Sequence, residues 1–212
     1  MDNTEIARQL DRARDGDQSA VGTLFESHRA RLERLVELRL DRRLRGRIDV
    51  ADVLQDTFLE AARRLGAYLE RPTMPFYLWL RFIANQRLQA LCRRHFGVGK
   101  RDVRREIPID KAPYPEASSE ALASQILGKL TTPSQAAMRT ELKASLDQAL
   151  ESMDPNNREI IALRHYEALG SAEAAHVLGI DKSAASKRYI RAIKRLKEIL
   201  DRIPGMSELQ WK

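Results

Sequence analysis

Apolar residues recur at helical spacing along almost the whole chain of 212 residues, and this periodicity constrains its fold more than any other feature. Alternating runs of Val, Ile and Thr, which would indicate β-strands, do not occur. Three helical stripes are especially clear, one after Asp17, one from Asp49 and one after Pro75, and both aspartates are suited to cap a helix. The sequence therefore predicts an all-α protein.

Prolines and glycines gather in the middle of the chain, where they interrupt the helical pattern. Four prolines and three glycines lie between positions 97 and 133. Proline lacks the backbone donor that a helix needs and disfavours a helical conformation of the residue before it. We therefore expect two helical domains joined by a flexible linker, with one short helix at 119–130 inside that linker. The expected boundaries are 1–97 for the first domain, 98–140 for the linker, 141–204 for the second domain and 205–212 for a C-terminal tail.

The charge of the chain favours a polyanionic partner. Its 37 Lys and Arg residues exceed its 30 Asp and Glu residues, which gives a net charge of +7. Such an excess points to nucleic acid before membrane. The chain has no run of 18 apolar residues and the stretch from Met1 to Leu10 is predominantly polar, so we expect no membrane span, no signal peptide and a cytoplasmic location.

Residues that carry catalysis or hold a metal ion are sparse. A single cysteine, Cys92, excludes a disulfide or a thiolate cluster within one chain. The four histidines are scattered without metal-ligand spacing, and His28 falls on an apolar stripe, as a core residue would. Neither a phosphate-binding glycine loop nor a nucleophile elbow is present. We therefore expect no enzyme activity, no catalytic residue, no metal site and no cofactor.

The C-terminal part has the layout of a helix-turn-helix motif. A short helix over 171–178 ends at Gly179, which can adopt the positive φ of a sharp turn, and a second helix follows, capped by Asp181 or Ser183. Residues 182–197 hold seven basic and no acidic side chains. In such a motif the second helix enters the DNA major groove; a solvated basic helix of an unrelated bundle is the alternative. The residues expected to face inward on it are Ile190, Ile193, Leu196 and Leu200.

A polar stripe runs along the second predicted helix, outside its apolar face. It contains Asp52, Gln55 and Asp56, with Leu59 and Arg63 further along. The spacing alone fits an ordinary solvated surface, so it assigns no function to this stripe.

The third predicted helix begins with a cluster of aromatic residues and continues with arginines. Aromatic rings can stack on unpaired bases while arginines hold phosphates. Packing of the rings in a core between three helices explains the cluster equally well, so both interpretations stay open. The residues concerned are Phe76, Tyr77, Trp79, Phe82, Arg87, Arg93 and Arg94.

Three segments carry a specific order and spacing: DVLQDTFL at 52–59, WLRFIA at 79–84, and the stretch from Leu178 to Ala192. Together they resemble the bacterial RNA polymerase sigma factors of the extracytoplasmic-function (ECF) group. The resemblance covers roughly 10–97 as sigma region 2 and 141–202 as region 4. It implies a protein that binds core RNA polymerase and directs promoter recognition, DNA melting and transcription initiation.

The resemblance also implies roles for individual residues. The polar stripe would bind core polymerase, the third helix with the loop at 66–75 would contact the minus-ten element, and the basic helix would contact the minus-thirty-five element of promoter DNA. An anti-sigma factor is a further expected partner. The polymerase-binding residues are Asp52, Gln55 and Asp56; the minus-ten residues are Phe76, Tyr77, Trp79, Gln86, Arg87, Arg93 and Arg94; the minus-thirty-five residues are Lys182, Ser183, Ser186, Lys187, Arg188 and Arg191.

The chain departs from the usual family pattern at a few positions. Gln86 stands where Asn is common, so the minus-ten base preference does not carry over. Ala174 and Ala185 replace the larger aliphatic residues usual in the core of the helix-turn-helix, and Ser186 and Lys187 reverse a frequent order.

Two alternatives belong to other functional classes. A stand-alone helix-turn-helix regulator would bind duplex DNA tightly without polymerase, because dimers of that kind read paired half-sites. A nucleic-acid enzyme would need an acidic or metal-binding cluster, for which Asp49, Asp52 and Asp56 are the only candidates.

Overall fold

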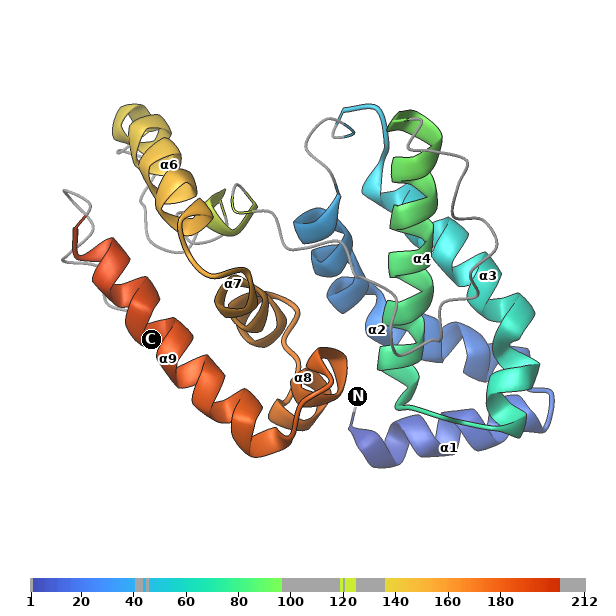
Figure 1. Ribbon diagram of the computed structural model, residues 1–212. Helices are drawn as coiled ribbons and strands as arrows, with labels where there is room; N and C mark the ends of the chain where they lie inside the picture. Colours follow the sequence, from blue (N-terminus) through green and yellow to red (C-terminus); the bar gives the residue numbers. More distant parts are fainter. Residues whose placement is uncertain are drawn as a thin grey trace. The chain divides into compact units, whose positions relative to one another are not determined.

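Helices form the regular secondary structure of the residues described in the computed structural model, namely 2–40, 44, 46–96, 119, 121–124 and 136–202. No strand occurs among these residues, which confirms the predicted all-α class (Figure 1). The chain divides into two units, Met1–Pro115 and Glu116–Lys212. No helix in the described part is both long and apolar enough to cross a membrane.

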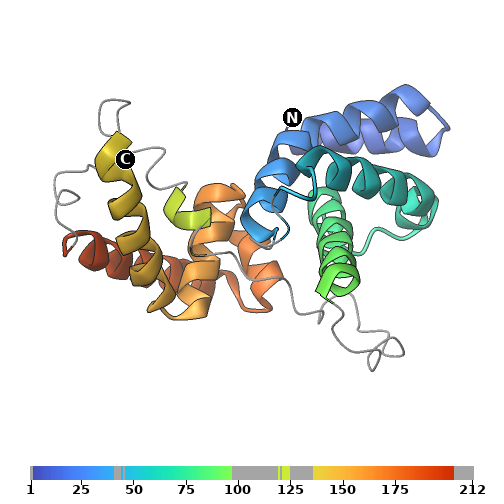
Figure 2. The same cartoon turned by 90° about the horizontal axis from the view of Figure 1, so that it is seen from above.

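The first unit is built around α2. This helix, Gln18–Arg39, packs against α1 (Asn3–Arg14), α3 (Val50–Glu70) and α4 (Phe76–Phe96), and α3 also packs along α4 (Figures 1 and 2). Its predicted core histidine, His28, is buried as expected. The apolar side chains at the centre of this core, all at most 2% exposed, are Leu24, Leu32, Leu35, Leu38, Val53, Leu54, Ala61, Leu80, Ile83, Ala84 and Leu88.

Helix α1 is an element that the apolar periodicity does not predict. Its start is marked by Asp2, whose side chain accepts a hydrogen bond from the backbone N–H of Glu5 at 2.7 Å. An acidic residue followed three positions later by Glu resembles the capping-box pattern, and that pattern was the available signal for this helix.

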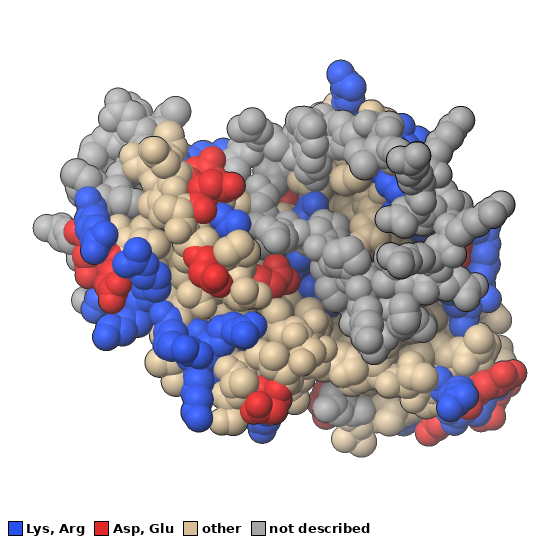
Figure 3. All heavy atoms as spheres, in the orientation of Figure 1, with Lys and Arg blue, Asp and Glu red and all other residues tan. Residues whose placement is uncertain are grey.

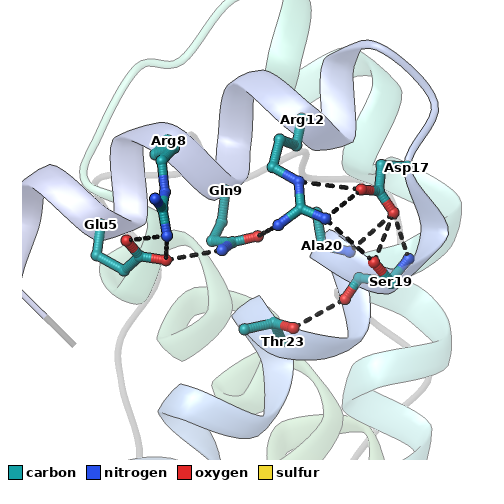
Figure 4. A network of polar contacts seen from close by, with 8 residues as sticks. All are labelled: Glu5, Arg8, Gln9, Arg12, Asp17, Ser19, Ala20 and Thr23. Carbon is teal, nitrogen blue, oxygen red and sulfur yellow. Dashed lines mark hydrogen bonds and ion pairs between the residues drawn. The ribbon is translucent and has the colours of Figure 1, made fainter.

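A network of polar side chains joins α1 to the start of α2 (Figure 4). The guanidinium of Arg12 donates to the Asp17 carboxylate through Nε at 3.0 Å and Nη2 at 2.5 Å. The same carboxylate accepts from the Ser19 hydroxyl at 2.7 Å. The hydrogen bonds from Ser19 and Arg12 lower the pKa of Asp17 to about 2. Asp17 therefore stays ionised and holds the corner between the two helices.

In the described part of the chain, aspartate side chains cap the beginnings of five helices. The caps predicted at Asp17 and Asp49 are confirmed: Asp17 accepts from the Ser19 N–H at 2.8 Å, and Asp49 accepts from the Ala51 N–H at 2.9 Å. A carboxylate at this position satisfies unpaired N–H groups and favours the positive end of the helix dipole. The five capping residues are Asp2, Asp17, Asp49, Asp154 and Asp181.

The second unit is organised around α9. This helix, Lys182–Leu200, packs against α6 (Ala136–Glu151), α7 (Pro155–Ile161) and α8 (Ser171–Leu178). Helix α7 continues into a five-residue π-helix, η3 (Ala162–Tyr166), before the chain turns into α8. The core side chains at most 2% exposed include Leu146, Leu150, Ile160, Ile161, Leu163, Tyr166, Ala174, Ala185, Ala192 and Leu196.

The described part of the second unit begins before the predicted boundary at 141. Helix α6 starts at Ala136, and residues 119 and 121–124 are helical within the segment predicted as linker. Leu122 is fully buried, and Ser119 hydrogen-bonds to Glu151 of α6. These residues therefore belong to the second unit. The remainder of the predicted linker and the tail at 205–212 lie outside the described residues.

Candidate nucleic-acid interface

The α8–α9 pair forms the turn that the sequence predicts. Gly179 has φ 62°, in the left-handed region, and the next residue, Ile180, returns its N–H to the carbonyl of Ala175 at 3.0 Å. The α9 cap is Asp181, whose carboxylate accepts from the Ala184 N–H at 2.8 Å. Ser183, the alternative cap, lies in the first turn of the helix. This hydrogen-bonded turn fixes where α9 leaves α8.

Small side chains let the two helices approach closely. Ala174 of α8 and Ala185 of α9 are 0% and 1% exposed, and Ala175 is also buried. With only a methyl group at each of these positions, the backbones can come near each other without a cavity. The substitutions that depart from the family pattern are therefore accommodated by close packing.

The outward side of α9 carries the basic residues. Lys182, Ser183, Lys187 and Arg191 are exposed, whereas Ser186 and Arg188 are half-buried. Figure 3 shows Lys and Arg side chains gathered along this helix. The structure thus brings the six predicted minus-thirty-five residues together in the first three turns of one helix.

The orientation of Ile190 differs from the sequence prediction. This residue was expected to face inward, but its side chain is 66% exposed, and Ile193 is only half-buried, while Leu196 and Leu200 are buried as expected. The buried stripe of α9 instead follows Ala185, Ala192 and Leu196, with half-buried Tyr189 at the helical spacing between them.

Tyr189 is held by two consecutive residues of η3, a contact that sequence reasoning missed. Its hydroxyl forms a hydrogen bond with Nε2 of His165 at 2.7 Å, and the guanidinium carbon of Arg164 lies 5.2 Å from the centre of its ring. Arg164 also donates to the carbonyl of Leu169 at 2.8 Å, in the turn before α8. The π-helix therefore fixes both the turn and the rotation of α9.

The polar stripe of α3 lies on the surface. Asp52, Gln55 and Asp56 are all exposed, and they share their side of the helix with Leu59, which is 52% exposed. A single exposed leucine is common on protein surfaces, so its exposure alone does not assign an interface to this side of α3.

The aromatic cluster at the start of α4 packs in the core, which decides between the two open interpretations. Phe76, Tyr77, Trp79 and Phe82 are 3%, 3%, 8% and 6% exposed. The ring of Trp79 stacks on Tyr68 of α3 with centroids 4.6 Å apart. Because α2 and α3 both pack on α4, its first half is surrounded, and in this arrangement its rings offer no open face for a base.

The loop before α4 is shorter than the resemblance implies. Helix α3 continues to Glu70, so the first residues of the predicted loop at 66–75 are helical. The hydroxyl of Tyr68 donates to the carbonyl of Met74 at 2.9 Å and so ties the remaining loop to α3. Burial raises the pKa of Tyr68 to about 12, so the hydroxyl keeps its proton for this bond.

The second half of α4 carries the polar minus-ten candidates. Arg93 and Arg94 are exposed near its end, and Gln86 and Arg87 are half-buried in its middle. Arg64 of α3 donates to the Gln86 side-chain oxygen at 2.9 Å, and Arg87 forms an ion pair with Glu60 of α3. Sequence reasoning did not single out Arg64 and Glu60, because their contacts with α4 join residues more than twenty positions apart.

The comparisons with known proteins agree with this geometry. Residues 143–196 match the family model "Sigma-70, region 4". BldN of Streptomyces coelicolor, an ECF RNA polymerase sigma factor, is 25% identical over 199 residues, which cover 94% of this chain and 67% of BldN. The RNA polymerase sigma factor NccH of Alcaligenes xylosoxydans is 31% identical over 199 residues, which cover 89% of this chain and 91% of NccH. The chain belongs to the ECF group of RNA polymerase sigma factors.

A solved structure is similar to this sigma factor over nearly its whole length. It is CnrH in complex with the cytosolic domain of CnrY; it has a TM-score of 0.54 and 26% sequence identity, and the match covers 93% of this chain and 97% of that one. Membership of the family makes this protein an initiation factor that binds core RNA polymerase and directs transcription from promoters. The predicted family and function are thereby confirmed.

Proposed function

We propose that this sigma factor reads the minus-thirty-five element with the outward side of α9. The observation that carries the proposal is the exposed, acid-free basic surface of residues 182–197, fixed on the protein by a packed helix-turn-helix. Lys187 and Arg191 would hold phosphates and set the register, because such contacts are independent of sequence. Ser183, Ser186 and Arg188 would contact base edges, and Lys182 would approach the backbone from the first turn of the helix.

The polar stripe of α3 is proposed to bind core polymerase. Asp52 and Asp56 would be repelled by DNA phosphates, so their carboxylates favour a basic protein surface over the promoter. Gln55 lies between the two aspartates and the exposed Leu59 lies beside them, so an amide and an apolar side chain are available for contact next to the carboxylates.

The polar half of α4 is proposed to contact the minus-ten element. Gln86, Arg87, Arg93 and Arg94 offer donors and positive charge to an opened strand. The aromatic residues Phe76, Tyr77 and Trp79 are buried at the start of the same helix. Their part in DNA contact is therefore indirect, through the position of α4.

Regulation by a protein partner is proposed as well. The related CnrH is in complex with the cytosolic domain of CnrY, so a cytoplasmic anti-sigma domain suits this chain, and we place the chain in the cytoplasm with the polymerase. We propose no catalytic activity of its own, in line with the role of sigma factors as initiation subunits.

Run-off transcription with purified core polymerase on a promoter library tests these assignments. Arg188→Ala is expected to lower initiation and relax the preference for the upstream element. Arg195→Ala is the matched control, because Arg195 lies on the same helix outside the proposed set and pairs with Glu198 at 3.1 Å. Equal effects of the two variants would contradict the proposed contact between Arg188 and the base edges of this element.

A second pair of variants tests the polymerase contact. Gln55→Ala with Asp56→Asn is expected to weaken co-elution with core polymerase, while Glu70→Gln, at the far end of the same helix, leaves it unchanged. Binding of core polymerase by the double variant at wild-type affinity would remove the α3 stripe from the interface.

A further inference from the structure

Glu60 of α3 gathers three arginines around a single carboxylate. Its Oε1 accepts from Nε of Arg64 at 2.7 Å, and its Oε2 lies 3.4 Å from a guanidinium nitrogen of Arg63. The same Oε2 forms an ion pair with Arg87, which comes from α4. The Glu60 side chain is only 14% exposed, so neighbouring groups cover most of its surface.

The arrangement extends from Glu60 to Gln86 through one guanidinium. Arg64 binds Glu60 through Nε and Nη2, and its Nη1 donates to Oε1 of Gln86 at 2.9 Å. Two consecutive side chains of α4, Gln86 and Arg87, are thus both held from α3 by the same carboxylate. Arg87 is held directly by Glu60, and Gln86 is held through the guanidinium group of Arg64.

This contact fixes which end of the Gln86 amide faces the solvent. A guanidinium has only donors, so the side-chain oxygen of Gln86 must face Arg64 and the NH₂ group must face away. Gln86 therefore presents hydrogen-bond donors, and the base that it reads must offer an acceptor. Without Arg64 the amide could turn and present its oxygen instead.

The charges of the cluster keep this arrangement intact at neutral pH. Burial raises the pKa of Glu60, but the hydrogen bond and charge of Arg64 and the charge of Arg87 outweigh it, so the net pKa is lowered. The carboxylate is therefore ionised, and with three guanidinium groups around it the cluster keeps a net charge of +2, which suits a nearby strand of DNA.

We propose that Glu60 is a positioning residue for minus-ten recognition: it holds Arg87 directly, and through Arg64 it turns the amide of Gln86 so that its NH₂ group meets an acceptor on the base. This inference rests on the proposed contact between α4 and the minus-ten element. An ion pair that only fastens α3 to α4 is the competing explanation.

The test compares Glu60→Gln with wild type in run-off transcription on promoters that carry each base at every minus-ten position. Glu60→Gln is expected to reduce the discrimination between bases at one minus-ten position about five- to tenfold. A reduction of this size corresponds to the loss of one or two hydrogen bonds. Arg64→Lys is expected to do the same, because lysine keeps the charge but lacks the fork that reaches Gln86. Glu26→Gln is the matched control, since Glu26 pairs with Arg29 at 2.7 Å on α2.

Two results would overturn the inference. One is a uniform fall in transcription and in melting temperature with unchanged base preference, which is what a purely structural ion pair predicts. The other is an effect of Glu60→Gln on base preference that persists in full when Gln86→Ala and Arg87→Ala are both already present. If instead neither Gln86→Ala nor Arg87→Ala alters minus-ten preference, the proposed function of α4 itself fails, and the two failures are thereby distinguished.

Discussion

Replacing Ala168 with glycine should stabilise the second unit of this sigma factor. Ala168 has φ 53°, the one non-glycine residue with positive φ in the described part of the chain. Its neighbours fix this conformation, since Glu167 donates its N–H to Ala162 and Leu169 donates to Leu163, both at 2.9 Å. The turn therefore cannot relax to relieve the contact between the Ala168 methyl group and its own backbone.

The magnitude follows from two opposing contributions. A left-handed conformation costs about 1–2 kcal/mol for a residue with a Cβ atom. Glycine costs about 0.5–1 kcal/mol in additional backbone entropy. The difference leaves a stabilisation of about 0.5–1 kcal/mol. For a unit of this size, such a gain raises the melting temperature by roughly 2–8 °C.

Differential scanning calorimetry of the full chain provides the measurement, with Ala144→Gly as the matched control. Both alanines are exposed and both belong to the second unit, but Ala144 lies in the interior of helix α6. Ala144→Gly should lower the free energy of unfolding of the second unit by about 1 kcal/mol, so the same substitution should stabilise the unit at position 168 and destabilise it at position 144. An unchanged or lowered melting temperature for Ala168→Gly would refute the reasoning.

Two further predictions concern single hydrogen-bonding and titrating groups. Tyr189→Phe keeps the ring against Arg164 but removes the hydrogen bond to His165. Urea unfolding should therefore show a free energy of unfolding lower by about 1 kcal/mol, and an unchanged value would mean that this bond does not hold α9. Burial, followed by the charge of Arg31, lowers the pKa of His28 to about 4, from 6.5. Neutral His28 therefore stabilises the fold above pH 6.5, and this contribution is lost as the pH falls toward 4. Between pH 7 and 5 the free energy of unfolding, measured by urea titration, should fall by about 2 kcal/mol more in the wild type than in His28→Phe. Parallel pH profiles of the two proteins would exclude His28 as the cause of the loss of stability.

Features governed by residues near in sequence were predictable from the chain alone. The caps at Asp17 and Asp49 and the turn at Gly179 each depend on contacts within a few residues, and all three occur as expected. The same holds for the basic surface of α9, because charge along one helix is visible without knowledge of its neighbours.

Features that depend on packing partners were not predictable in this way. Helical spacing does not say whether α4 is covered on one side or on two, so it left the environment of Trp79 open. Ile190 lies near the edge of the α9 stripe, and the contacts of Tyr189 with η3 decide which of the two side chains turns inward. The pairing of Glu60 with Arg87 spans two helices, whereas its pairs with Arg63 and Arg64 lie within one.

The five aspartate caps have a consequence for how this chain folds. Each cap binds a backbone group two or three residues away, so the start of each of these helices is specified before any distant part of the chain is in place. Chains rich in such local contacts fold quickly, because little loop entropy is lost before native contacts form. During synthesis helices α1 to α4 emerge before the second unit exists, so the core of the first unit can form while α9 is still being synthesised.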